Sequence, residues 1–145
     1  MKNIFVQGPI TPDKIATSIA HHQVKTNIGA HDIFLEQVRA DEIDGKKVAA
    51  IEYTAHEEMA LNIVHEIREA TFAKHKDLTC MHIYHSLGQV KAGEICLFVF
   101  VSSGHRKAAF SACRDLVELI KKEVPIFGKE LFEDESHQWK VNTNE

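Results

Sequence analysis

Residues 102–130 hold the side chains best suited to chemistry in this 145-residue sequence. The segment reads SSGHRKAAFSACRDLVELIKKEVPIFGKE, with His105 and Arg106 behind a turn of small residues and with Lys121 and Lys129 near its other end. The free N–H groups and the dipole of a helix favour negative charge at its N-terminus. Cations at that place therefore predict a binding site for an anion, such as a phosphate or a carboxylate.

One helix is expected from His105 to about Lys122, because Pro125 forbids its continuation. Its buried stripe is expected to consist of Ala109, Cys113, Leu116 and Ile120. Arg106 and Lys121 lie on the flank of this helix, fifteen residues and therefore about 22 Å apart along its axis. If both side chains serve one site, one of them comes from a second copy of the chain. The spacing thus predicts a homodimer with composite sites.

Each of these cations also has a simpler interpretation when it is taken alone. His105 and Arg106 would then be a solvated first turn, and lysines in a last turn complement the helix dipole. Arg39, after an expected strand and before a polar turn, would be an ordinary surface residue. The functional interpretation depends on the cations being considered together.

The rest of the sequence predicts the elements that position this helix. A helix is expected to begin at Pro12 behind a Thr11 cap, and a longer one at Thr54 or His56. Asp44-Gly45 predicts a hairpin turn. Strands are expected at 3–7, 30–39, 48–53, 78–87 and 94–101, with a turn region at 88–93 and one or two further strands after residue 125. This order predicts an α+β fold, a mainly antiparallel sheet with helices packed on one face, in a single domain of residues 1–145.

Composition narrows the class of protein. The formal net charge of −4 argues against a general nucleic-acid binder, which is normally strongly basic. No window is apolar enough for a membrane span, and the N-terminus lacks the pattern of a signal peptide. The cysteines Cys80, Cys96 and Cys113 form no CxxC pair and lie in or beside apolar runs. We interpret them as buried free thiols of a cytoplasmic protein.

Ten histidines raise the question of a metal site. His82 and His85 are three residues apart in an expected strand, so their side chains lie on opposite faces of the sheet and cannot share an ion. The sequence contains no HExxH motif, and its cysteines lack zinc-ligand spacing. We therefore expect no metal.

Several separated motifs carry a family resemblance. They are the HRxxAF helix start at His105, the lysine at 121, and the element from Pro125 through Phe127 to Lys129 and Glu130. Val38-Arg39, Glu52-Tyr53, Met59-Ala60, Gly88 and Gly93-Glu94 support them in the same order. Through these motifs the sequence resembles the catalytic (large) subunit family of molybdopterin synthase, from about Phe34 to Trp139.

The resemblance implies a sulfurtransferase with an α/β hammerhead-like fold. Such enzymes convert cyclic pyranopterin monophosphate to molybdopterin in molybdenum cofactor biosynthesis. They take two sulfurs from the C-terminal Gly-Gly thiocarboxylate of a small ubiquitin-like carrier subunit. The resemblance also implies a central homodimer with a carrier at each end, a heterotetramer, and no cofactor besides the pterin substrate.

The resemblance assigns roles to residues of this chain. Lys121 matches the family's catalytic lysine and would stabilise an oxyanion or carry a proton, and Lys129 is a second catalytic candidate. The expected substrate-binding residues are Phe34, Gln37, Val38, Arg39, His105, Arg106, Gly128 and Glu130. Arginine suits this role because its planar fork matches phosphate oxygens.

The sequence departs from the family pattern at three places. Gly128 stands where the family usually has a lysine, Glu36 where it has a glycine, and Ser86 where it often has an arginine. Lys129 would replace the missing amine only if it reaches the same face of its strand. A catalytically weak scaffold of the same fold, which binds the pterin or the carrier, is therefore an alternative. An unrelated anion-binding regulatory domain is the third hypothesis.

Overall fold

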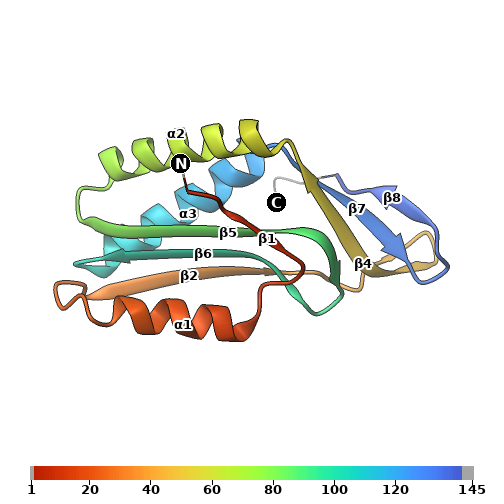
Figure 1. Cartoon of the computed structure of the whole chain (residues 1–145), viewed down its shortest axis with the longest axis horizontal. Coiled ribbons are helices and arrows are strands. Elements are labelled where there is room, and N and C mark those ends of the chain that lie inside the picture. Colours follow the sequence, from red (N-terminus) through yellow and green to blue (C-terminus); the bar gives the residue numbers. More distant parts are fainter. Residues whose placement is uncertain (1, 142–145) are drawn as a thin grey trace.

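The computed structural model of the chain describes residues 2–141, and its strands form one sheet with helices on both sides (Figure 1). The elements in chain order are β1 (Phe5–Gln7), α1 (Pro12–His22), β2 (Ala30–Gln37), β3 (Glu42–Ile43), β4 (Lys46–Ala55), α2 (Glu57–Lys74), β5 (Leu78–Lys91), β6 (Ile95–Ser103), α3 (Arg106–Glu123), β7 (Ile126–Phe132) and β8 (His137–Trp139). The strand order is β2-β6-β5-β4-β7-β8, with β1 beside β5 and β3 beside β4. Of these pairings β1–β5 is parallel and the others are antiparallel. The predicted α+β fold with a mainly antiparallel sheet is confirmed.

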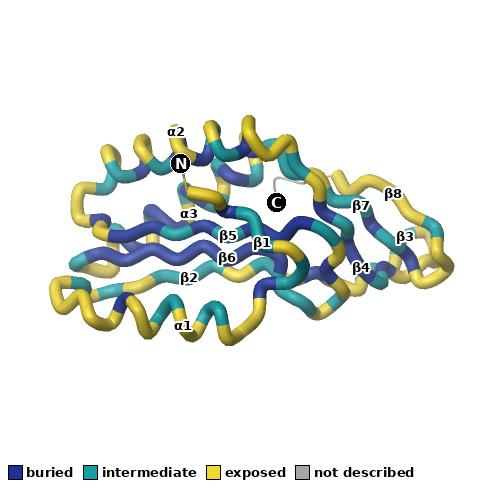
Figure 2. The backbone as a smooth tube through the Cα atoms, in the orientation of Figure 1, coloured by how far each residue is buried: buried dark blue, intermediate teal, exposed yellow. Residues whose placement is uncertain are grey.

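Around β6 both faces of the sheet are covered, and the side chains of β6 are apolar on both of its sides. Leu97, Val99 and Val101 pack with α2 and α3 in the main core, whereas Phe98 and Phe100 lie in a second core with Ile15 and Ile19 of α1. Figure 2 shows β6 as a buried strand along its length. The expectation that helices pack on one face therefore holds for α2 and α3 and is wrong for α1.

Strand β5 is longer than the sequence predicts and joins two parts of the sheet. Its residues 78–85 pair with β6, and its residues 88–91 pair with β4. The turn expected from Gly88 is instead a bend within the strand, at a φ of +81° that glycine adopts without strain. The chain reverses direction later, near Gly93 at a φ of +92°.

Local signals elsewhere are confirmed. Thr11 caps α1, since its hydroxyl accepts a hydrogen bond from the Lys14 N–H at 3.3 Å. Asp44 and Gly45 have φ values of 52° and 78°, as a two-residue hairpin turn between β3 and β4 requires.

Helix α3 buries the stripe that its periodicity predicts. Ala109, Cys113, Leu116 and Ile120 are each at most 4% exposed. At its N-terminus the His105 N–H donates to Asp77 Oδ2 at 2.7 Å, so a carboxylate from a distant loop lies at the start of the helix.

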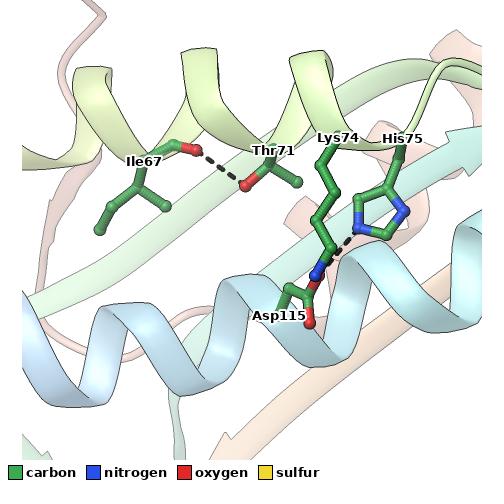
Figure 3. A network of polar contacts seen from close by, with 5 residues as sticks. All are labelled: Ile67, Thr71, Lys74, His75 and Asp115. Atoms are coloured by element: carbon green, nitrogen blue, oxygen red, sulfur yellow. Dashed lines mark hydrogen bonds and ion pairs between the residues drawn. The ribbon is translucent and has the colours of Figure 1, made fainter.

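A polar network ties α3 to the end of α2 (Figure 3). Asp115 Oδ2 of α3 accepts from Lys74 Nζ at 2.9 Å and from His75 Nε2 at 2.8 Å. Burial acts to raise the pKa of Asp115, but hydrogen bonds from Lys74 and His75 outweigh it and hold that pKa below its usual value. The network adds a polar link between two helices that already share the main core.

Candidate active site

Lys121 lies in the last turn of α3 at a small cavity beside the end of β2. Its Nζ contacts both carboxylate oxygens of Glu36, at 2.6 Å and 2.5 Å. The cavity has a volume of about 30 Å³, enough for a water molecule. Tyr53, His85, Gly128 and Lys140 contribute to its wall, together with apolar side chains from α3 and β7.

The charges of this cavity belong to two amines and one carboxylate. Burial acts to raise the pKa of Glu36, but the adjacent Lys121 ammonium outweighs it and lowers that pKa, so Glu36 is ionised at neutral pH. Burial lowers the pKa of His85 to about 4 and raises the pKa of Tyr53, so both groups are neutral. Lys121 and Lys140 are thus the cations that face an incoming ligand.

The cysteines are free and buried, as predicted. Burial raises the pKa of Cys96 to about 11 and that of Cys113 to about 12. Both thiols are therefore protonated at neutral pH and are poor nucleophiles.

A second hollow lies at the opposite end of α3. It is lined by Gly29, Ala30, Gly104 and the cationic run 105–107. The backbones approach closely here, since a Cβ on Gly29 would come within 2.2 Å of the Gly104 oxygen. His105 and Arg106 are exposed beside this approach, where an anionic group can reach them.

A groove of about 280 Å³, mostly apolar but with Asp32, Arg114 and Glu118 in its lining, lies along α3 and the edge strand β2. Phe34 and Val117 line it, and Phe110 at its side is 61% exposed. Phe34, which is predicted to contact the substrate, therefore lies between the Lys121 cavity and the hollow beside His105.

The structure separates the predicted site residues into two groups. Strand β2 begins beside Ser103, next to His105, and reaches the Lys121 cavity with Glu36. Six residues of strand span about 20 Å. His105 and Arg106 therefore do not meet Lys121 within one chain, in agreement with the length of the helix.

The other predicted residues lie near the Lys121 end but outside its cavity wall. Val38 is 2% exposed, and its backbone bonds to Glu94 and Gly93; Gln37 sits at a register shift of β2. Arg39 is exposed, and its Nη2 pairs with Asp41 at 3.2 Å. Arg39 can therefore exchange this ion pair for an anionic ligand.

Strand β7 places its predicted residues on different faces. Gly128 lies at the cavity, whereas Lys129 pairs with Glu52 at 3.3 Å and lies 5.9 Å from the centre of the Trp139 ring. Glu130 is 7% exposed and accepts from Gln138 at 3.2 Å. Lys129 therefore does not supply an amine to the Lys121 cavity in this structure.

Sequence reasoning missed Lys140, and it treated His85 only as a candidate metal ligand. A single lysine after Trp139 carries no motif, so its place in the cavity has no local signal. In the described part of the chain, no group of three or more His, Cys, Asp or Glu side chains is arranged to hold a metal ion. Between residues 2 and 141, no helix is long and apolar enough to cross a membrane.

The chain is similar to known proteins of one family. The family model described as "MoaE protein" matches residues 6–123. A relative from Aspergillus niger, named molybdopterin synthase catalytic subunit, is 35% identical over 92% of this chain and 71% of its own length. The chain spans only 31–33% of the length of matched Drosophila relatives with the same name.

Solved structures agree with the sequence matches. The crystal structure of molybdopterin synthase from Staphylococcus aureus has a TM-score of 0.82 at 29% identity, over 98% of this chain and 99% of that one. A complex of subunits 1 and 2 of molybdopterin-converting factor from Helicobacter pylori has a TM-score of 0.80 at 17% identity, over 95% of this chain and 89% of that one. At that identity, the second likeness concerns the fold alone.

Proposed function

We propose a function from one premise: the chain belongs to the MoaE family. It is the catalytic subunit of a molybdopterin synthase, a sulfurtransferase of molybdenum cofactor biosynthesis. It converts cyclic pyranopterin monophosphate to molybdopterin with two sulfurs from a small carrier subunit. The observation that carries this proposal is the position of Lys121, the lysine that matches the family's motif, at the end of α3 in a small cavity beside the Glu36 carboxylate.

Lys121 is the residue that performs the chemistry. Attack on a thiocarboxylate, and attack by one, both pass through tetrahedral anions, which a nearby ammonium stabilises. The partial burial of Lys121, whose side chain is 33% exposed, strengthens this interaction, because charges attract more strongly where there is less water. Lys121 is one-third exposed, so it is reachable by a narrow extended tail.

His105, Arg106 and Arg39 bind the substrate phosphate. Because the first two lie far from Lys121 in one chain, the complete site uses His105 and Arg106 of a second copy. Strand β2 is an edge of the sheet, and Leu35 and Phe110 beside it are 41% and 61% exposed. This apolar edge supports a homodimer in which the groove along α3 is shared.

The partner is a small ubiquitin-like subunit whose C-terminal Gly-Gly thiocarboxylate reaches Lys121. The Helicobacter pylori complex, which pairs two subunits of a molybdopterin-converting factor, supports a small-subunit partner. We infer a heterotetramer of two catalytic chains and two carriers. The reaction needs no cofactor beyond the pterin phosphate, and we place it in the cytoplasm.

Reconstitution tests this function. The purified chain is mixed with thiocarboxylated carrier and cyclic pyranopterin monophosphate, and the dithiolene product is detected as its oxidised fluorescent derivative. Product formation that depends on the thiocarboxylate supports the proposal. A carrier with an ordinary carboxylate end is the matched control, and equal signal from both carriers contradicts sulfur transfer.

A scaffold of the same fold is the second candidate. The Glu36 carboxylate forms an ion pair with Lys121, so the positive charge needed for catalysis is partly neutralised. Gly128, which stands where the family usually has a lysine, adds no second amine to the cavity. Intact binding of pterin and carrier without product, under conditions where a control synthase turns over, favours the scaffold.

A further inference from the structure

The Lys121 cavity holds one cation more than its carboxylate neutralises. Glu36 bonds directly to Lys121, and no Glu36 ion pair to Lys140 lies within 4 Å among the described residues. Lys140 nevertheless lines the same cavity. Within residues 2–141, its ammonium is therefore the cation of this cavity that is not already paired with a carboxylate.

The fold places Lys140 there through the pairing of β7 with β8. Lys129 pairs with Trp139 in the register, and its Nζ lies 5.9 Å from the centre of the Trp139 ring, so the two side chains share one face of the β7–β8 pair. Side chains alternate along an extended chain, so the next residue, Lys140, turns to the opposite face. Its backbone N–H donates to the Gly128 oxygen at 2.7 Å, which holds Lys140 at the glycine of the cavity wall.

Gly128 has no side chain to extend into the cavity that Lys140 lines. A Cβ at position 128 would lie 3.0 Å from Ile51 Cγ2 and 3.3 Å from Tyr53 Cε1, so even a methyl group would crowd the wall. A long side chain from β7 is disfavoured there. A second amine beside Lys121 is then expected from outside β7, and Lys140, in the segment after β8, lines the cavity.

We propose that Lys140 is a substrate-binding residue that, together with Lys121, binds the C-terminal thiocarboxylate of the carrier subunit. This inference rests on the proposed function. Glu36 competes with the incoming anion for Lys121, and Lys140 offsets that competition by giving the cavity a net positive charge. The thiocarboxylate is thus bound between two amines contributed by α3 and by the segment after β8.

The charge of Lys140 already acts on its neighbours. Burial acts to raise the pKa of Glu36, whereas Lys121 and, to a smaller extent, Lys140 lower it. Lys140 also acts to lower the pKa of Cys96 against the dominant effect of burial. Its ammonium is therefore electrostatically coupled to the groups around the cavity.

A synthetic peptide that ends in a Gly-Gly thiocarboxylate tests the proposal by calorimetric titration of the full chain. Lys140→Gln should weaken peptide binding about tenfold, the size of one charge-assisted hydrogen bond. Lys140→Arg should keep the affinity within about threefold of wild type, because the positive charge is retained. Lys47→Gln, which removes an exposed lysine of β4 outside the cavity, should leave the affinity unchanged.

Unchanged binding by Lys140→Gln, an equal loss in Lys140→Arg, or no binding by the wild-type chain overturns the inference. A thermal melt of each variant checks that Lys140, which is exposed, is not needed for folding. Turnover of the reconstituted complex is scored separately. If peptide binding depends on Lys140 but no product forms, the inference is retained and the proposed function is rejected. If product forms but peptide binding does not depend on Lys140, the proposed function is retained and the inference is rejected.

Discussion

Replacement of Lys121 by alanine should damage catalysis and stability through two separable effects. Loss of an ammonium that stabilises a tetrahedral anion should lower the rate of product formation about 10²–10³-fold. The same change leaves Glu36, whose side chain is 20% exposed, without its directly bonded cation. A hydrogen bond to a charged group contributes about 1–3 kcal/mol, so the free energy of unfolding should fall by about that amount at neutral pH.

The pH dependence of this destabilisation identifies its cause. In the wild-type chain the pKa of Glu36 is lowered from its usual 4.5, so the pair stabilises the fold above that pH, and the stabilisation is lost as the pH falls through the folded-state pKa. Without Lys121, burial acts to raise the same pKa. The variant should therefore be most destabilised at neutral pH and should approach wild type at an acidic pH below the lowered folded-state pKa of Glu36, where this carboxyl is protonated in both proteins.

Urea unfolding at both pH values, with product formation by the reconstituted complex, measures the two effects. Lys122→Ala is the matched control, because Lys122 is in the same helical turn, is exposed and loses the same interaction with the helix dipole. The double variant Glu36→Gln/Lys121→Ala should regain stability but not activity. Equal destabilisation at both pH values, or near-normal turnover of Lys121→Ala, would refute the assigned role of the ion pair or of the lysine.

Three further changes test other parts of the structure. Arg106→Ala should weaken binding of the pterin phosphate about tenfold in calorimetry without changing carrier affinity, and an unchanged pterin affinity would count against the phosphate role. Phe110→Asp should shift the homodimer toward monomer in sedimentation experiments, because it places a charge on a 61%-exposed apolar surface at the β2 edge; an unchanged dimer would exclude this edge as the interface. Gly128→Ala should lower the unfolding free energy by about 1–3 kcal/mol, since its Cβ would meet Ile51 at 3.0 Å, and a variant as stable as wild type would show that the wall relaxes.

Much of the fold was predictable because its signals are local. The buried stripe of α3, the Thr11 cap and the Asp44-Gly45 turn each depend on neighbouring residues along the chain, and each is confirmed. Two predictions failed where a distant part of the chain decided the outcome. Gly88 bends β5 instead of ending it because β4 continues the pairing, and α1 covers the second face because both sides of β6 are apolar.

The candidate site divides in the same way. From the sequence alone, the helical rise already separates Arg106 from Lys121, because covalent geometry sets that distance wherever the helix lies. Only the tertiary structure decides that Glu36, eighty-five residues away, bonds to Lys121, that Lys129 pairs with Glu52 away from the cavity, and that Lys140 lines the cavity. These outcomes depend on the register between strands, in which a shift of one residue reverses every side chain, and no pattern within a single strand determines that register.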